Sequence, residues 1–168
     1  MRTLRLPLNV IAAVALALGV VACASGTTTV VAPTEAKTTF ASAQFERGDD
    51  TVEVKDEYAQ YFGAKLFEAF FEEGAFAQGE ELTVRYRFIQ LDKGSQAKRY
   101  FIGFGAGKGS LTIEAVFLNP NGEELSKINV GGEISVGFFG GSFQEALAKA
   151  ADEVAEYAAT NFLDAAPE

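Results

Sequence analysis

The chain has 168 residues, with 23 acidic and 14 basic side chains, a formal charge of −9, a single cysteine and no histidine. Without histidine or a second cysteine, the usual zinc and copper ligand sets, Cys-His nucleophiles, Ser-His-Asp triads and internal disulfides are excluded. The acidic balance argues against nucleic acid as a partner. We therefore expect a non-enzymatic protein that uses no metal and no cofactor.

The N-terminus has the pattern of a lipoprotein signal peptide over residues 1–22. Arg2 and Arg5 precede an apolar run, residues 8–21, that is too short for a convincing membrane span. The run ends in Val-Val-Ala-Cys, which resembles a bacterial lipobox with cleavage between Ala22 and Cys23. The sole cysteine would then carry the acyl chains, palmitate among them, that anchor the protein in a membrane. The alternative is an ordinary secretory signal in which Cys23 is incidental.

The residues after Cys23 predict where the protein works. No aspartate follows the cysteine to resemble an inner-membrane retention signal, so Ala24 favours the outer membrane, facing the periplasm. Residues 23–36 are rich in Thr and Ser and predict a flexible tether with a reach of about 20 Å. Removing residues 1–22 deletes two of the 14 basic residues and none of the 23 acids, so the mature charge is 12 − 23 = −11.

The rest of the chain alternates between strand and helix patterns. Residues 38–46 predict a first strand, and residues 53–73 a helix that ends before Gly74. Its expected apolar stripe is Ala59, Phe62, Gly63, Leu66, Phe67 and Phe70. Strands are expected at 82–91, 111–118 and 126–138, with a turn at 119–122. A last helix from Ser142 to Phe162 opens with a capping-box pattern, Ser142 to Glu145. Its expected inner face is Phe143, Leu147, Ala151, Val154, Ala158 and Phe162.

This order, β-α-β-β-β-α, predicts an α+β fold. We expect a largely antiparallel sheet of four to five strands with two helices packed on one face. The folded domain is expected to cover residues 37–164, followed by a short tail, residues 165–168.

A run of glycines at every second residue, Gly103, Gly105, Gly107 and Gly109, is the most unusual internal feature. It matches neither the Walker pattern nor the dinucleotide fingerprint. If the turn pairs Leu118 with Glu123, then Leu111 meets Val130, Gly109 meets Gly132, and all four glycines face the core. Two roles remain open: the glycines allow close packing against the sheet, or they form a groove that admits a small molecule or a peptide.

The opposite sheet face is the predicted interaction face. Its expected members are Arg85, Arg87, Ile102, Phe104, Val116, Leu118, Leu125 and Phe139. This set is more apolar than an exposed face should be, which favours docking of an envelope protein or of a second copy. Arg85 or Arg87 beside Phe104 could add cation-π contacts. The alternative is that an N-terminal segment covers this face.

The stretch KRYFIGFGAGKGSLTIEAV, residues 98–116, resembles the signature of the bacterial lipoprotein family catalogued as domain of unknown function 4410. The resemblance extends over residues 38–163, although the turn Asn-Pro-Asn-Gly at 119–122 departs from the family's usual acidic turn. It implies a cell-envelope lipoprotein and supplies no catalytic residue, substrate or cofactor. The leading interpretation is a periplasm-facing, outer-membrane accessory or assembly subunit, and the alternative is a binding module that uses the glycine-rich strand.

Overall fold

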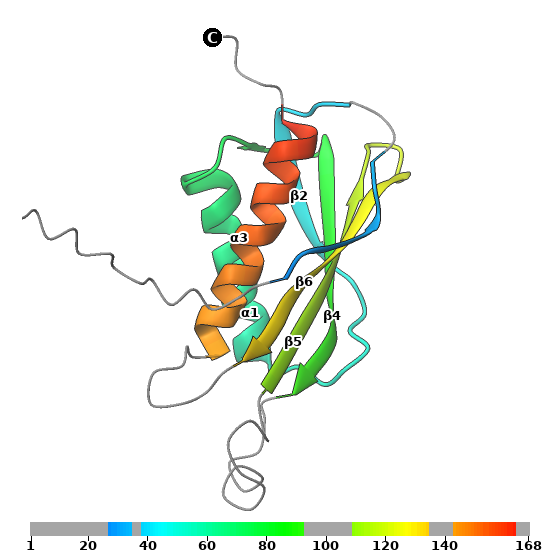
Figure 1. Cartoon of the computed structure of the whole chain (residues 1–168). Coiled ribbons are helices and arrows are strands. Elements are labelled where there is room, and N and C mark those ends of the chain that lie inside the picture. Colours follow the sequence, from blue (N-terminus) through cyan, green and yellow to red (C-terminus); the bar gives the residue numbers. More distant parts are fainter. Residues whose placement is uncertain (1–26, 35–37, 93–108, 135–142, 164–168) are drawn as a thin grey trace, which may run out of the picture.

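Two long antiparallel strands, β4 and β5, form the centre of a six-stranded sheet that two helices cover on one face (Figure 1). The computed structural model describes residues 27–34, 38–92, 109–134 and 143–163. The strands are β1 (Thr29–Ala32), β2 (Ser42–Arg47), β3 (Ala77–Gln78), β4 (Leu82–Asp92), β5 (Gly109–Leu118) and β6 (Glu124–Ile134). The helices are α1 (Asp56–Phe67), continued by the π-helical turn η1 (Glu68–Glu72), and α3 (Phe143–Phe162).

The predicted α+β class is confirmed, and the predicted number of strands is wrong. The sheet has six strands in the order β1-β6-β5-β4-β2-β3. Three neighbouring pairs are antiparallel, but β2 pairs in parallel with both β3 and β4. The parallel β2–β4 pair requires a crossover connection, and α1 supplies it.

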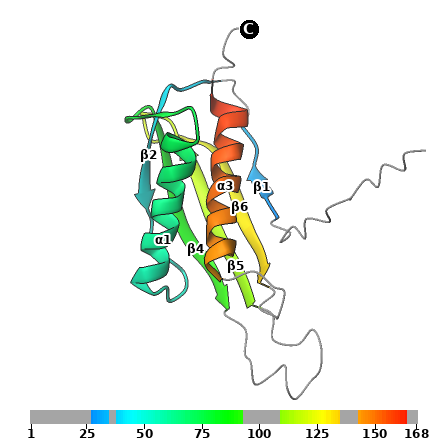
Figure 2. The same cartoon turned by 90° about the vertical axis from the view of Figure 1, so that its left-hand side faces the viewer.

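Strand β1 corrects the predicted tether. Thr29–Ala32 lies inside the range 23–36 that composition assigned to a flexible linker, yet it pairs with β6. Figure 2 shows β1 at the free edge of the sheet, beside β6. A four-residue edge strand buries little, so it leaves no alternation of apolar and polar residues to read.

The side chains between the helices and the sheet form the core. Its largest fully buried members are aromatic: Phe62, Phe70, Phe88, Phe117 and Phe162. The rings of Phe62 and Phe88 lie 5.7 Å apart, which joins α1 to β4. Those of Phe117 and Phe162 lie 5.2 Å apart, which joins β5 to α3. Burying such rings is the main favourable contribution to folding.

The predicted helix faces are largely confirmed. Five of the six inner residues of α3 are buried, and Phe143 is half-buried. In α1 the expected stripe is correct except at Phe67, which is 38% exposed. The helix switches to a π-turn at Glu68, and Phe67 packs against Phe71 at 5.0 Å instead of against the core. Ser142, the predicted cap, lies outside the described residues.

The β5–β6 hairpin keeps its predicted faces but not its predicted register. Leu118 pairs with Glu124 rather than Glu123, which shifts the register by one residue. A bulge between Phe117 and Leu118 shifts it by one residue more. Leu111 therefore meets Gly132, and Gly109 meets Ile134. A register shift of one residue would have turned every side chain of the strand to the other face. A shift of two residues leaves each side chain on its predicted face.

The turn itself explains the first offset. The Asn119 Oδ1 atom accepts hydrogen bonds from the backbone N–H groups of Asn121 and Glu123, at 2.9 and 3.0 Å. The Asn119 backbone N–H also donates to the Glu123 oxygen at 3.0 Å. Gly122 has a φ of 81°, as tight turns often require. These bonds hold Glu123 inside the turn, so pairing begins at Glu124.

Candidate interaction face

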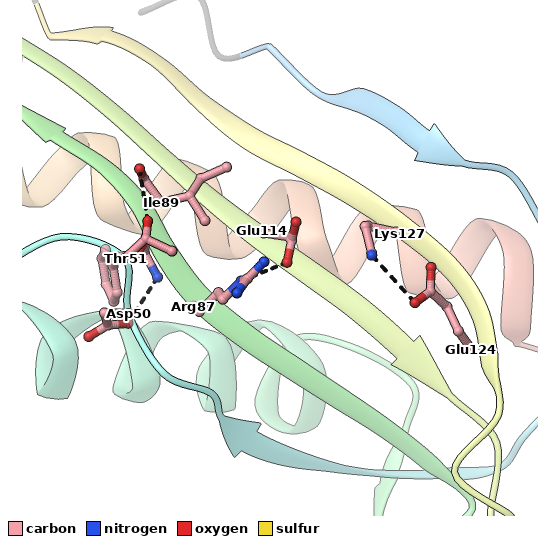
Figure 3. Close-up of polar contacts among 8 residues, drawn as sticks. Asp50, Thr51, Arg87, Ile89, Glu114, Glu124 and Lys127 are labelled. Atoms are coloured by element: carbon pink, nitrogen blue, oxygen red, sulfur yellow. Dashed lines mark hydrogen bonds and ion pairs between the residues drawn. The ribbon is translucent and has the colours of Figure 1, made fainter.

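The sheet face turned away from the helices is the candidate interaction face, and the described part of it is mostly polar. Its β4 members include Thr83, Arg85 and Arg87, which alternate with the buried residues Val84, Tyr86 and Phe88. Arg85 and Arg87 thus lie on the face that their spacing predicted. Figure 3 shows this face with the helices behind it.

Both arginines are paired with carboxylates. The Arg85 Nε and Nη2 atoms donate to Glu46 Oε2 on β2, at 3.0 and 2.9 Å. The Arg87 Nε atom donates to Glu114 Oε1 on β5 at 2.8 Å (Figure 3). The Glu114 side chain is only 14% exposed, so this second pair is the better shielded one. The two guanidinium groups therefore serve first to link β4 to its two neighbours.

Further polar contacts extend across the same face. The Gln90 Nε2 atom donates to Ser110 Oγ at 2.9 Å, and Thr112 Oγ1 donates to Gln90 Oε1 at 3.3 Å. Lys127 and Glu124 of β6 form an ion pair at 3.4 Å (Figure 3). The cross-strand pairs contribute roughly a few tenths of a kcal/mol each, and they mainly specify which strands are neighbours.

The free edge of β4 beyond β2 is closed by residues 48–51. The Gly48 backbone N–H donates to the Tyr86 oxygen at 2.8 Å, and the Thr51 N–H to the Phe88 oxygen at 3.0 Å. In return, the Phe88 N–H donates to Asp50 Oδ1 at 3.0 Å, and Thr51 Oγ1 donates to the Ile89 oxygen at 3.2 Å (Figure 3). Asp50 thus completes the sheet, which is a structural role.

The apolar members of the predicted face that the structure describes are not fully exposed, whereas the prediction had expected an exposed face. Val116 is half-buried, and Leu118 is 5% exposed beside a shallow hollow of about 260 Å³ at the turn end of the sheet. Ile102, Phe104 and Phe139 lie outside the described residues, so their part in an interaction face stays a prediction. The same holds for a cation-π contact with Phe104.

The glycine run is described only at its end. Gly109 is buried at the start of β5 and shares the core-facing side with Leu111 and Ile113, as expected. Gly103, Gly105 and Gly107 lie outside the described residues, and so do Ala22 and Cys23. The groove that these glycines would form stays a prediction.

Sequence reasoning missed the carboxylates on this face. The alternation of Glu114 with Ile113 and Ala115 could have placed it on this face. Its partner Arg87 could not be predicted, because the β4–β5 register is not fixed by the long connection of residues 93–108. Glu46 faces Arg85 because β2 runs parallel to β4, which no local pattern reveals. Within the described ranges, no cluster of acidic or thiol groups could hold a metal ion.

Comparison with protein families gives a match to the model described as domain of unknown function (DUF4410), over residues 29–137. This range begins at the first residue of β1 and covers more than half of the chain. The chain belongs to the DUF4410 family. The resemblance seen in residues 98–116 is thereby confirmed, and strand β1 is part of the DUF4410 match.

Solved structures show which fold this DUF4410 protein shares. A PelC dodecamer from Paraburkholderia phytofirmans is 8% identical with a TM-score of 0.50, and the match covers 84% of this chain and 100% of that one. A point variant of the PelC dodecamer from the same organism is 10% identical with a TM-score of 0.49, over 77% and 94% of the two chains. No curated protein matches the chain.

Proposed function

We propose that this DUF4410 protein is an outer-membrane lipoprotein that faces the periplasm and serves as a non-enzymatic accessory or assembly subunit of an envelope complex. The observation that carries the proposal is the short distance along the chain between Cys23 and the folded sheet. The Thr27 backbone N–H already donates to the Gly131 oxygen on β6, at 2.7 Å. A lipobox cysteine immediately before a folded domain is the arrangement of an anchored subunit.

The anchor supplies the membrane partner. Two or three acyl chains on Cys23, at about 0.8 kcal/mol per buried CH₂, hold a protein far more firmly than one chain does. Ala24 after the cysteine supports retention in the outer membrane. In the described ranges, no helix is both long and apolar enough to cross a membrane.

The subunit part of the proposal rests on the protein's shape and on one structural relative. PelC, whose fold this chain shares at a TM-score of 0.50, is described as a dodecamer. The edge of the described sheet that lies away from β1 is the two-residue strand β3, and edge strands are sites where sheets meet other chains. Self-association, or association with another envelope protein, is the mode of action that we propose.

Lipidation is tested with an alkyne analogue of palmitate fed to cells that express the full chain. We expect the label on the wild-type protein in the outer-membrane fraction and its loss in Cys23→Ser. An Ala24→Asp variant should keep the label and shift toward the inner membrane. Wild-type protein without label, or Cys23→Ser protein with it, would contradict the proposal.

Subunit behaviour is tested by crosslinking in envelope extracts and by light scattering of the detergent-solubilised lipoprotein. We expect a crosslinked species larger than one chain and a molar mass that is a multiple of the monomer. Phe104→Ser with Phe139→Ser should abolish the crosslink if the predicted interaction face forms the contact. A monomer at every concentration and no crosslinked partner would contradict the subunit role.

A further inference from the structure

Strand β1 lies next to the proposed anchor. Between Cys23 and Thr27 there are four backbone steps, which span at most about 14 Å when fully extended. Composition had predicted a tether of about a dozen residues, but β1 removes most of that length. A domain held this closely cannot turn its β1 edge far from the bilayer surface.

The start of the domain is firmly attached to its body. The Thr27 N–H bonds to the Gly131 oxygen, and Thr28 Oγ1 donates to Glu153 Oε2 on α3 at 3.1 Å. Because these contacts precede β1, the short link from Cys23 ends on a fixed point of the sheet. Where the lipid is held, the edge strand is held as well.

The β1 edge is apolar and exposed. Of the three large hydrophobic side chains that are exposed in the described residues, two are in β1, where Val30 is 47% and Val31 is 52% exposed. A bulge leaves Val31 without a partner residue on β6. The whole run 27–34, TTTVVAPT, carries no charge, in a chain of which 22% is charged.

The opposite edge of the sheet has the contrary character. There β3 (Ala77–Gln78) is followed by Glu80 and Glu81. Glu81 accepts hydrogen bonds from the backbone N–H groups of Ala41 and Ser42, which lower its pKa and keep it charged. Bilayers that contain anionic lipids repel such an edge, and they do not repel the uncharged one.

We infer that the β1 edge, through Val30 and Val31, is seated on the lipid surface beside the Cys23 anchor, which gives the domain a fixed orientation on the membrane. The inference rests on the proposed lipidation of Cys23. Because the anchor already holds the strand at high effective concentration, a weak contact suffices to orient the domain. Covering the edge with lipid headgroups also shields a strand that would otherwise be free to pair.

The test uses the mature chain, residues 23–168, coupled at Cys23 to a maleimide phospholipid in phosphatidylethanolamine–phosphatidylglycerol vesicles that contain brominated lipid. The chain has no tryptophan and one cysteine, so Val31→Trp introduces the only tryptophan and Cys23 is the only coupling site. We expect bromine to quench Val31→Trp about twofold more than a matched control, since the seated edge lies at the headgroup boundary.

Phe67→Trp is the matched control. It also replaces an exposed hydrophobic residue, and it lies by Phe71, which contacts Phe45 on β2 at the far side of the sheet. Equal quenching of both probes, or of neither, would overturn the inference. A blue-shifted Val31→Trp that escapes bromine and depends on protein density would mean that a second copy covers the edge, which overturns it too.

The two proposals fail in different ways. Because the lipid is attached chemically, the vesicle experiment gives its answer whether or not cells acylate Cys23. Lack of palmitate labelling in cells would contradict the proposed function, and unquenched Val31→Trp would contradict only the seating of β1.

Discussion

The two faces of the central sheet are built from the same strands but by opposite chemistry. On the helix side, Phe88 and Phe117 are fully buried among aromatic rings. On the other side of the same two strands, Arg87 and Glu114 form an ion pair. Each of them is next in sequence to a buried residue. The apolar face supplies most of the stability, while the polar pairs on the other face help to specify which strands are neighbours.

This difference teaches that the polar face is not a spare core. The sequence predicted a face more apolar than an exposed face should be. In the structure, however, Arg85 and Arg87 on this face form ion pairs with Glu46 and Glu114. Any partner that docks there meets fixed ion pairs before it meets apolar side chains. Four changes would break or sharpen the comparison between the two faces.

The largest effect is expected on the helix face. Phe117→Ala should lower the free energy of unfolding by about 3 to 5 kcal/mol, because it leaves a cavity beside Tyr157 and Phe162. Urea titration followed by circular dichroism measures the change. Phe67→Ala, at the 38% exposed position, is the control and should cost less than about 1 kcal/mol. Equal costs would deny that the buried rings dominate.

The next effect concerns the β6 backbone between the faces. Gly131 has a φ of 132°, and a Cβ there would lie 2.2 Å from the Leu111 oxygen. Gly131→Ala should therefore lower the free energy of unfolding by about 2 to 3 kcal/mol. In Gly122→Ala, at a φ of 81° with nothing within 4 Å, the strain alone should cost about 1 kcal/mol. A reversed order in thermal melts would contradict the hairpin register.

Smaller effects are expected on the polar face. A double-mutant cycle with Arg87→Met and Glu114→Gln should give a coupling energy of about 0.5 to 1 kcal/mol, decreasing as salt is added. The pair of Arg85 and Glu46 is more exposed, 47% and 53%, so its cycle with the same substitutions should give less. A larger coupling for the exposed pair would show that shielding of Glu114 does not strengthen its bond.

The smallest effect is a pH dependence on the helix side. Burial raises the pKa of Glu153, while the hydrogen bond from Thr28 opposes that rise. The folded state therefore keeps this proton at pH values where the unfolded chain has lost it, so this group's contribution to stability falls as pH rises through the folded pKa. Glu153→Gln cannot titrate, so it removes this pH-dependent loss of stability. Its side-chain oxygen can still accept the hydrogen bond from Thr28.

We expect the melting temperature of wild type, minus that of Glu153→Gln, to decrease between about pH 4 and about pH 7. Thermal melts at several pH values measure this difference. Gln144→Ala, at an exposed position, removes no titratable group and is the control: the melting temperature of wild type minus that of Gln144→Ala should stay constant over the same pH range. A difference that increases with pH would mean that the carboxylate is stabilised by its surroundings.

Local patterns were sufficient wherever an element buries one regular face. The alternation in β4 and the three-and-four spacing in α3 predicted which side chains face the core, because burial imposes the period of the element itself. The same alternation predicted that Arg85 and Arg87 share the other face. Their partners were beyond prediction, since Glu46 and Glu114 come from strands whose neighbours are set by the whole fold.

By itself, the sequence determined the α+β class, the core faces of the long elements and the family to which the chain belongs. Only the tertiary structure decided the sheet order, the two-residue register shift of the hairpin and the presence of β1 in the sheet. The physical reason is that edge strands and turns bury little apolar surface, so they leave no periodic signal. Their positions depend on backbone hydrogen bonds to distant segments, as Thr27 bonds to Gly131.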